Sequence, residues 1–171
     1  MAVFDIQKDD IITRDPDRPA ISIQGGSQSS RGAEFTAAFQ ATPALRLEGN
    51  LAYTDAKFDK LVEAGGNRAG NRPMNVPRTT ANLWGHYRVG AWQASLGLRH
   101  VGERFGNNAN TVSLPSYTVA DAALSWQMDA RTTLSLIGRN LTDKMYLGSS
   151  YGSQFLIGQG RRFEIAAHIR F

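Results

Sequence analysis

Apolar and polar residues alternate one by one along most of this chain, and this period of two constrains the fold more than any other feature. The clearest case is residues 162–171, in which every second residue is apolar: Phe163, Ile165, Ala167, Ile169 and Phe171. Side chains of a β-strand point to opposite faces in turn, whereas an amphipathic helix needs apolar residues three and four positions apart. The chain is therefore predicted to be all-β.

Other segments alternate in the same way, and together with the last one they predict about eight strands. They are residues 3–12, 33–41, 45–54, 81–88, 92–99, 117–126 and 132–140. Most are close to the roughly 9–11 residues that a tilted strand needs to cross a hydrocarbon layer. These lengths fit an antiparallel up-and-down barrel in a membrane.

The links between the predicted strands alternate between short and long. The short links are residues 42–44, 89–91 and 127–131, and the long ones are residues 13–32, 57–78, 102–116 and 141–161. Gly32 is expected to end the first long link, where the backbone turns into a strand. Short periplasmic turns at one rim and long extracellular loops at the other are typical of outer-membrane barrels.

Composition narrows the class of protein. The 171 residues include no cysteine, which excludes a disulfide scaffold and a cysteine zinc site. No stretch approaches the roughly 18 consecutive apolar residues of a transmembrane helix. The mean hydropathy of −0.33 agrees with a barrel, whose strands need only every second residue to be apolar. The net charge of +4 comes from dispersed arginines, which argues against a nucleic-acid partner.

Two further observations bear on location. Residues 1–5 have neither the basic region nor the apolar run of a signal peptide, so the protein either stays in the cytoplasm or has been separated from its export signal. Aromatic residues favour a membrane barrel over a soluble sheet, because they lie at predicted strand ends on the apolar face, where barrels carry interfacial girdles. They are Tyr53, Tyr87, Trp92, Trp126 and Phe171.

Several short segments, in collinear order, carry a family resemblance. They are SRGAEF at 30–35, LAYTDAKF at 51–58, NVPRTTANLW at 75–84, GLRHVGER at 97–104, LPSYT at 114–118 and NLTDKMY at 140–146, followed by a terminal strand ending in Arg170-Phe171. Together they cover nearly all of the chain. In these segments the chain resembles the C-terminal part of the barrel of TonB-dependent outer-membrane receptors, particularly the ferric-siderophore group.

The resemblance implies import of a ferric siderophore or a similar scarce ligand through a barrel of about 22 strands, closed by an N-terminal plug and energised by the TonB complex. It implies outer-membrane lipid and the barrel-assembly machinery as further partners, and no cofactor. Measured against that architecture, the chain is expected to lack the plug, the TonB-contacting segment, the signal peptide and roughly the first fourteen strands. Residues 1–171 are thus expected to be a C-terminal barrel segment that transports nothing alone.

Ligand contacts are expected from the long loops and the upper wall of the lumen. Iron chelates are often anionic or aromatic, so arginine and aromatic side chains suit them. The candidates are Arg68, Arg72, Arg104, Phe105, Tyr146, Tyr151 and Phe155. The resemblance also implies a barrel-assembly signal in the apolar stripe of the last strand, which consists of Phe163, Ile165, Ile169 and Phe171.

Neither a catalytic nor a metal-binding set is evident, so the chain is not expected to be an enzyme. His86, His100 and His168 fall on different predicted strands, and no nucleophile motif accompanies the serines. Three alternatives remain open. One is a self-contained barrel of eight strands with a structural or adhesion role, closed around its polar side chains. The others are an outer-membrane enzyme and a soluble β-sandwich that binds a partner.

Overall fold

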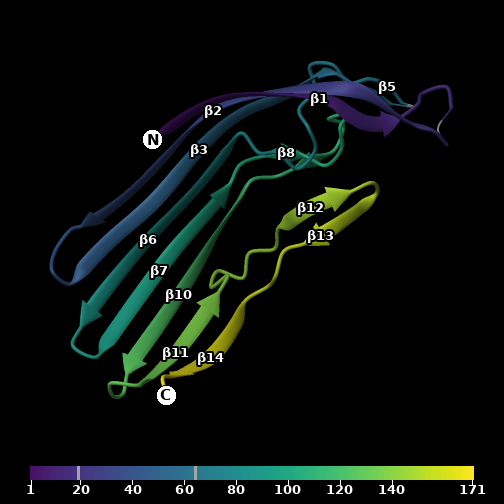
Figure 1. Cartoon of the computed structure of the whole chain (residues 1–171). Coiled ribbons are helices and arrows are strands. Elements are labelled where there is room, and N and C mark those ends of the chain that lie inside the picture. Colours follow the sequence, from purple (N-terminus) through teal and green to yellow (C-terminus); the bar gives the residue numbers. More distant parts are fainter. Residues whose placement is uncertain (19, 64) are drawn as a thin grey trace.

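The computed structural model describes residues 1–18, 20–63 and 65–171, so Pro19 and Ala64, in two of the predicted long links, lie outside the described residues. One antiparallel sheet of eight strands dominates the fold (Figure 1). In sheet order the strands are β1 (Ala2–Arg14), β2 (Ser22–Gln40), β3 (Leu45–Lys60), β6 (Thr79–Val89), β7 (Trp92–Val101), β10 (Tyr117–Gln127), β11 (Thr132–Arg139) and β14 (Arg162–Ile169). Within the described ranges, no helix is long and apolar enough to span a membrane.

The connections confirm the predicted difference between the two ends of the sheet. Short turns join β2 to β3, β6 to β7 and β10 to β11 at one end. Small hairpins lie in the longer connections at the other end of the sheet (Figure 1). They are formed by β4 (Val62–Glu63) and β5 (Gly66–Asn67), by β8 (Arg104–Phe105) and β9 (Ser113–Leu114), and by β12 (Leu147–Tyr151) and β13 (Gln154–Ile157).

The sheet is curved and open. Each strand pairs with its sequential neighbour in the sheet, so the topology is an up-and-down meander. In the part of the chain that the structure describes, β1 pairs only with β2 and β14 only with β11. Closure of these eight strands into a small barrel of their own is therefore not the arrangement of this structure.

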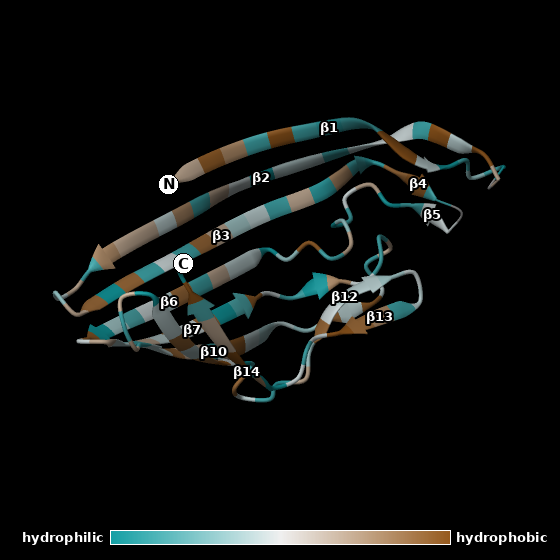
Figure 2. Cartoon of the chain, turned by 60° about the horizontal axis from the view of Figure 1, so that its bottom comes forward, coloured by the Kyte–Doolittle hydropathy of each residue, from teal (hydrophilic) through white to brown (hydrophobic). Residues whose placement is uncertain are grey.

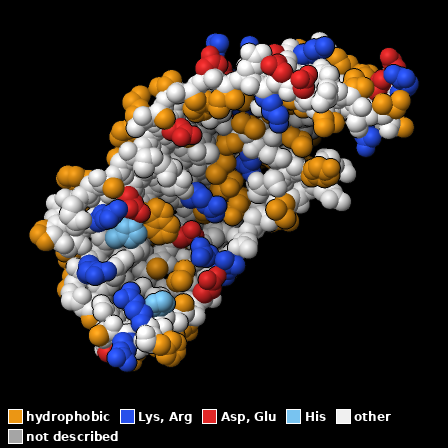
Figure 3. Space-filling model, in the orientation of Figure 1, with side chains coloured by type: hydrophobic (Ala, Val, Ile, Leu, Met, Phe, Trp, Pro, Cys, Tyr) orange, Lys and Arg blue, Asp and Glu red, His pale blue; other side chains and the backbone are white. Residues whose placement is uncertain are grey.

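The pairing register separates an apolar face from a polar one. Phe35 lies opposite Leu51, Leu83 opposite Leu98, and Leu136 opposite Ile165. Colouring by hydropathy shows the resulting alternation along the strands (Figure 2). These apolar side chains are exposed, whereas Figure 3 shows charged and histidine side chains gathered on the concave face. A soluble sheet would bury its apolar face, so this distribution is that of a barrel wall.

Buried apolar residues lie at the end of the sheet that carries the hairpins. Phe58 and Leu61 at the end of β3, Leu114 in β9, and Tyr117 and Val119 at the start of β10 are buried. This small core packs the long connections against the strands and against one another. It fixes the geometry of the loops above the sheet.

The first three strands are longer than predicted. β2 begins at Ser22 rather than at residue 33, β1 continues to Arg14, and β3 continues to Lys60. Most of the predicted link 13–32 is thus strand, and the connection is only residues 15–21. The added part of β2 is rich in glycine, serine and glutamine and shows no regular alternation of apolar and polar residues. Alternation gives no signal for such a segment.

Gly32 lies inside β2, so the prediction that it ends a loop is wrong. It pairs with Phe4 in β1 and with Thr54 in β3. A Cβ at this position would lie 2.5 Å from the Phe4 ring and would collide with the backbone oxygen of Tyr53. Glycine is required here by the close approach of neighbouring strands.

Replacing Gly32 with alanine is expected to destabilise the sheet by about 1–3 kcal/mol, because the backbone of β3 must shift to admit the methyl group. Gly85→Ala is the matched control, since a Cβ there meets only Leu47 at an ordinary distance of 3.4 Å. Urea unfolding of the complete gene product in detergent measures both. Equal midpoints for the two variants would contradict the expectation.

Candidate functional site

Asparagine side chains link the long connections into one body. The side-chain amide of Asn75 donates to the backbone oxygen of Ser150 at 2.8 Å, and the Ser150 amide donates back to Asn75 Oδ1 at 2.9 Å. Between the first two of these connections, the Asn110 side chain accepts from the Arg72 amide at 2.9 Å and donates to the Arg72 oxygen at 2.8 Å. The segments 61–78, 102–116 and 140–161 are therefore held together by hydrogen bonds.

Arg104 lies at the centre of this loop body and is only 2% exposed. Its Nη2 donates to the backbone oxygens of Leu147 and, at 2.8 Å, of Gly148. Its guanidinium carbon lies 5.4 Å from the centroid of the Tyr117 ring, within the range of a cation–π interaction. Arg104 thus joins β8 to the β12–β13 hairpin through two carbonyls.

A hollow of about 690 Å³ lies between the polar face of the sheet and the segment that contains β12 and β13. Its charged wall is formed by Arg99, Asp121, Arg139 and Arg162, which come from four neighbouring strands. Tyr146 stacks on Tyr117 beside this wall, with ring centroids 4.1 Å apart. Residues of β13 complete the lining from the other side.

Positive charge exceeds negative charge on the wall of the hollow. Arg139 and Arg162 stand directly opposite each other on β11 and β14, and both reach Glu164, at 3.6 Å and 3.0 Å. Arg99 forms no salt bridge with a residue that the structure describes, and its Nη2 lies 3.5 Å from the Tyr146 hydroxyl oxygen. Asp121 is engaged elsewhere, since it accepts from the Asn140 amide at 2.7 Å.

Asn140 fixes the segment that covers the hollow. It is buried with a φ of 48°, in the left-handed region that asparagine tolerates better than most residues. Its side chain donates to the oxygens of Lys144 and Gln159 at 2.9 Å and accepts from the Lys144 amide at 2.9 Å. These bonds tie both ends of the β12–β13 segment to the end of β11, so the hollow is preformed.

The predicted ligand-contact residues are distributed over the loop body. Tyr146 lines the hollow, Tyr151 stands at the tip of the hairpin with 79% of its surface exposed, and Phe155 follows it on β13. Arg68 pairs with Glu63 at 3.1 Å. Arg104 is buried as described above. Their contact with a ligand stays a prediction.

Arg72 and Phe105, two further predicted residues, lie together, with the guanidinium carbon 5.2 Å from the ring centroid. Burial and, to a smaller extent, the nearby Arg78 lower the pKa of Arg72 below its usual range. Arg72 keeps its positive charge despite this lowering, because the pKa of an arginine side chain starts far above neutral pH. The pair forms a cation–π contact at the edge of the loop body.

Sequence reasoning did not single out Arg99, Arg139 and Arg162 as ligand candidates. Each sits on the polar face near the loop end of its strand, and Arg139 and Arg162 flank the last long link in the sequence. Their position near the long links was the one signal in the sequence that could have marked these arginines as ligand candidates. The sequence does not show that the β12–β13 hairpin folds over the three arginines.

A second polar cluster lies closer to the short turns. His86 Nδ1 and Ser95 Oγ are 2.8 Å apart, and His86 Nε2 is 3.4 Å from Glu48 Oε1. Ser95, His86 and Glu48 thus follow one another in the order of a nucleophile, a base and a carboxylate. The sequence alone did not suggest this cluster. The strands that carry these three residues are paired with neighbouring strands on both sides. Their backbone amides are therefore used in hydrogen bonds of the sheet, whereas a nucleophilic enzyme needs such amides for its oxyanion hole. Within the described ranges, no group of three His, Asp or Glu side chains could hold a metal ion.

Comparison with known proteins identifies the family. A family model described as TonB dependent receptor-like, beta-barrel matches residues 1–141. This chain belongs to the TonB-dependent receptor family. The resemblance noted in the sequence is thereby confirmed, as is the all-β barrel architecture.

Two curated relatives match along nearly the whole chain. The metal-pseudopaline receptor CntO of Pseudomonas aeruginosa is 29% identical over 100% of this chain and 25% of its own length. The ferrichrome outer membrane transporter/phage receptor of Escherichia coli is 28% identical over 99% of this chain and 24% of its own length. The chain thus spans about a quarter of the relatives that it matches.

A solved receptor structure agrees with this fold. The siderophore receptor PiuA of Acinetobacter baumannii superposes with a TM-score of 0.82 and 25% identity, covering 98% of this chain and 25% of PiuA. Barrels of this family lie in the outer membrane of Gram-negative bacteria, and this segment belongs there. Its short turns are periplasmic, and its long connections are extracellular.

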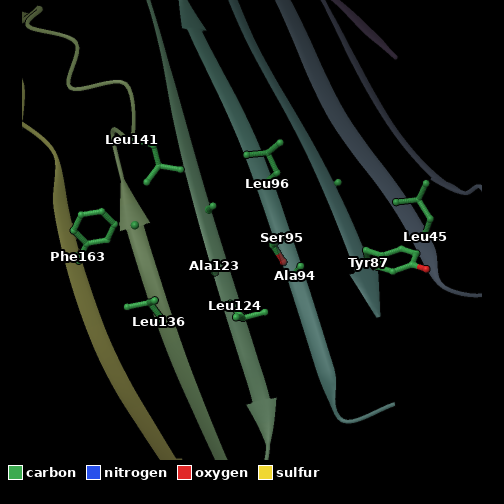
Figure 4. Close-up of a pocket in the computed structure, with 13 residues that line it drawn as sticks. Leu45, Tyr87, Ala94, Ser95, Leu96, Ala123, Leu124, Leu136, Leu141 and Phe163 are labelled. Carbon is green, nitrogen blue, oxygen red and sulfur yellow. The ribbon is translucent and has the colours of Figure 1, made fainter. Parts of the chain in front are cut away.

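This membrane orientation assigns the apolar face of the receptor segment to lipid. A shallow groove of about 540 Å³ crosses that face between Leu45 and Tyr87 on one side and Leu136 and Phe163 on the other (Figure 4). Small residues on the neighbouring strands, including Gly85, Ala94, Ala122 and Gly138, leave the groove open. Its side chains offer no charged group to a polar ligand, so the hollow on the lumen side is the candidate ligand site.

Proposed function

We propose that residues 1–171 form the C-terminal barrel segment of an outer-membrane receptor that imports a ferric siderophore or a similar scarce chelate. The observation that carries this proposal is the preformed hollow on the lumen face, where three arginines lie beneath an extracellular hairpin. A dissolved ligand that reaches the mouth of the barrel would meet these groups before entering the lumen. Energy would come from the TonB complex through a part of the receptor outside this segment.

The relatives support this proposal. Their names assign metal-pseudopaline to one receptor and ferrichrome to another, so both handle metal chelates. The segment's share of these relatives, about a quarter, fits one part of a larger barrel whose remaining strands pair with β1 and β14. The proposed activity is transport rather than catalysis, and the strands that carry the Glu48–His86–Ser95 cluster are paired with described neighbours on both sides, which engages their backbone amides in the sheet.

Iron uptake tests the proposal. The complete gene product that contains this segment is expressed in an iron-starved Gram-negative host that lacks its own siderophore receptors. A panel of ferric chelates should restore growth with at least one member, and inactivation of TonB in the host should abolish that growth. Failure of every chelate to bind the purified protein or to support growth would contradict the proposal. A folded, heat-modifiable species formed by residues 1–171 alone would favour the self-contained barrel instead.

The terminal stripe is proposed to recruit the barrel-assembly machinery. Phe171 follows β14 with its side chain fully exposed, and Phe163, Ile165 and Ile169 are exposed on the same face. Phe171→Ala is expected to lower the amount of folded protein in the outer membrane several-fold. Tyr151→Ala at the hairpin tip is the control, because it removes an exposed aromatic residue outside the stripe. Equal outer-membrane levels of the two variants would count against the assembly role.

A further inference from the structure

Two residues of like charge face each other across neighbouring strands in the wall of the hollow. Like charges directly opposite each other on neighbouring strands are destabilising, and Arg139 and Arg162 occupy such a position. A single carboxylate, that of Glu164, lies within reach of both guanidinium groups. Exceptions to local rules of this kind are expected at functional sites. The excess positive charge suits a ligand that brings negative charge of its own.

Arg99 adds a further guanidinium on the same side of the hollow. It has no carboxylate partner among the described residues, and its contact with the Tyr146 hydroxyl is 3.5 Å long. The side chain is exposed, so several of its N–H donors remain available to a ligand. Guanidinium groups bind carboxylate and similar paired oxygens through two parallel hydrogen bonds.

Apolar side chains complete the hollow on the extracellular side. Leu156 and Ile157 of β13 line it with 66% and 62% of their surfaces exposed. A ligand in the hollow would therefore meet cationic groups on the sheet and apolar side chains on the hairpin. Because Asn140 ties the covering segment to the end of β11, little ordering is required when a ligand binds.

We infer that this hollow selects ferric chelates with a net negative charge, such as catecholate or carboxylate complexes, over neutral hydroxamate complexes. The inference rests on the proposed function and specifies its substrate class. Anionic oxygens on the periphery of the chelate accept hydrogen bonds from Arg99, Arg139 and Arg162, while its apolar parts contact Leu156 and Ile157. A neutral chelate leaves the guanidinium groups without a counter-charge and therefore gains less binding free energy.

Equilibrium binding to the complete gene product in detergent tests the selection. The probes are ferric enterobactin, an anionic catecholate complex, ferric citrate, an anionic carboxylate complex, and ferrichrome, a neutral hydroxamate complex. At least one anionic probe should bind roughly tenfold or more tightly than ferrichrome, with an affinity that falls as ionic strength rises. Ferrichrome binding as tightly as both anionic probes would overturn the inference while leaving the proposed function intact. If neither these three probes nor any other ferric chelate bound to the protein, the proposed function itself would be contradicted.

Substitutions locate the effect. Arg99→Gln and Arg162→Gln should each weaken the anionic probe roughly tenfold, since each removes a charge-assisted hydrogen-bond donor, and should leave ferrichrome nearly unchanged. Arg88→Gln is the matched control, because Arg88 occupies the same face near the periplasmic turns and bonds Gln93 at 2.6 Å. Gel mobility before and after heating verifies that all variants are folded. An unchanged anion affinity in both hollow variants, or the same loss in Arg88→Gln, would overturn the inference.

Discussion

Replacing Arg104 with methionine will release the β12–β13 hairpin from the rest of the loop body. Methionine retains part of the apolar stem but offers no donor, so the half-buried backbone oxygens of Leu147 and Gly148 lose their bond to Arg104. Hydrogen bonds from charged donors contribute about 1.5–3 kcal/mol each, and a loss of about 3 kcal/mol is expected for the pair. Local opening of residues 141–161 would then become roughly a hundredfold more frequent.

Hydrogen exchange of the backbone amides in residues 141–161 measures this opening. Arg72→Met is the matched control, because Arg72 also lies over an aromatic ring but its side chain is less buried than that of Arg104. Exchange in the control should stay within a few-fold of the unaltered protein. If Arg104→Met exchanged no faster than the control, Arg104 would not be the residue that holds the hairpin.

Replacing Leu96 with arginine will destabilise the barrel in lipid by about 2–4 kcal/mol, the cost of a charge near the middle of the lipid face. Leu96 is 56% exposed on the apolar side and lines the groove of Figure 4. Trp92 and Trp126, stacked at 5.4 Å, mark the periplasmic end of this face. Leu96 lies four residues along β7 from Trp92, roughly 13 Å, which places it near half the height of the apolar band.

Ala123→Arg is the matched control for Leu96→Arg. Ala123 neighbours Ala122, the cross-strand partner of Leu96, and its side chain points to the polar face at nearly the same depth. Urea-driven unfolding in lipid vesicles should show a large loss for the first variant and a small one for the second. A reversed order would mean that the polar face meets lipid, and the membrane orientation would be wrong.

The strands were predictable wherever the two faces meet different environments. β6, β7, β10 and β11 agree with the alternating segments to within two residues at each end, because lipid on one side and a wet lumen on the other impose opposite demands. The loop end of β2 meets no such contrast. Its serines and glutamines pair with neighbouring strands through backbone atoms, which any sequence supplies.

The candidate site was less predictable than the fold. Tyr146 was anticipated from its residue type, and the structure places it in the hollow. Nothing in the local sequence indicates that Arg104 is buried, since its carbonyl partners lie 43 and 44 residues away. The arginines of the wall share the hollow only because the register sets Arg139 opposite Arg162 and because Asn140 folds the following segment over them.

The open edges of the sheet set the scale at which the membrane-embedded protein can unfold. Outside the described pairings, the outer edges of β1 and β14 present backbone donors and acceptors, and in hydrocarbon each unsatisfied group costs several kcal/mol. Neither edge can rest in lipid without a neighbouring strand. If residues 1–171 form one part of a larger barrel, as proposed, the smallest cooperative unit in the membrane is a closed ring of strands larger than this sheet, and one substitution in β7 shifts the melting of that entire ring.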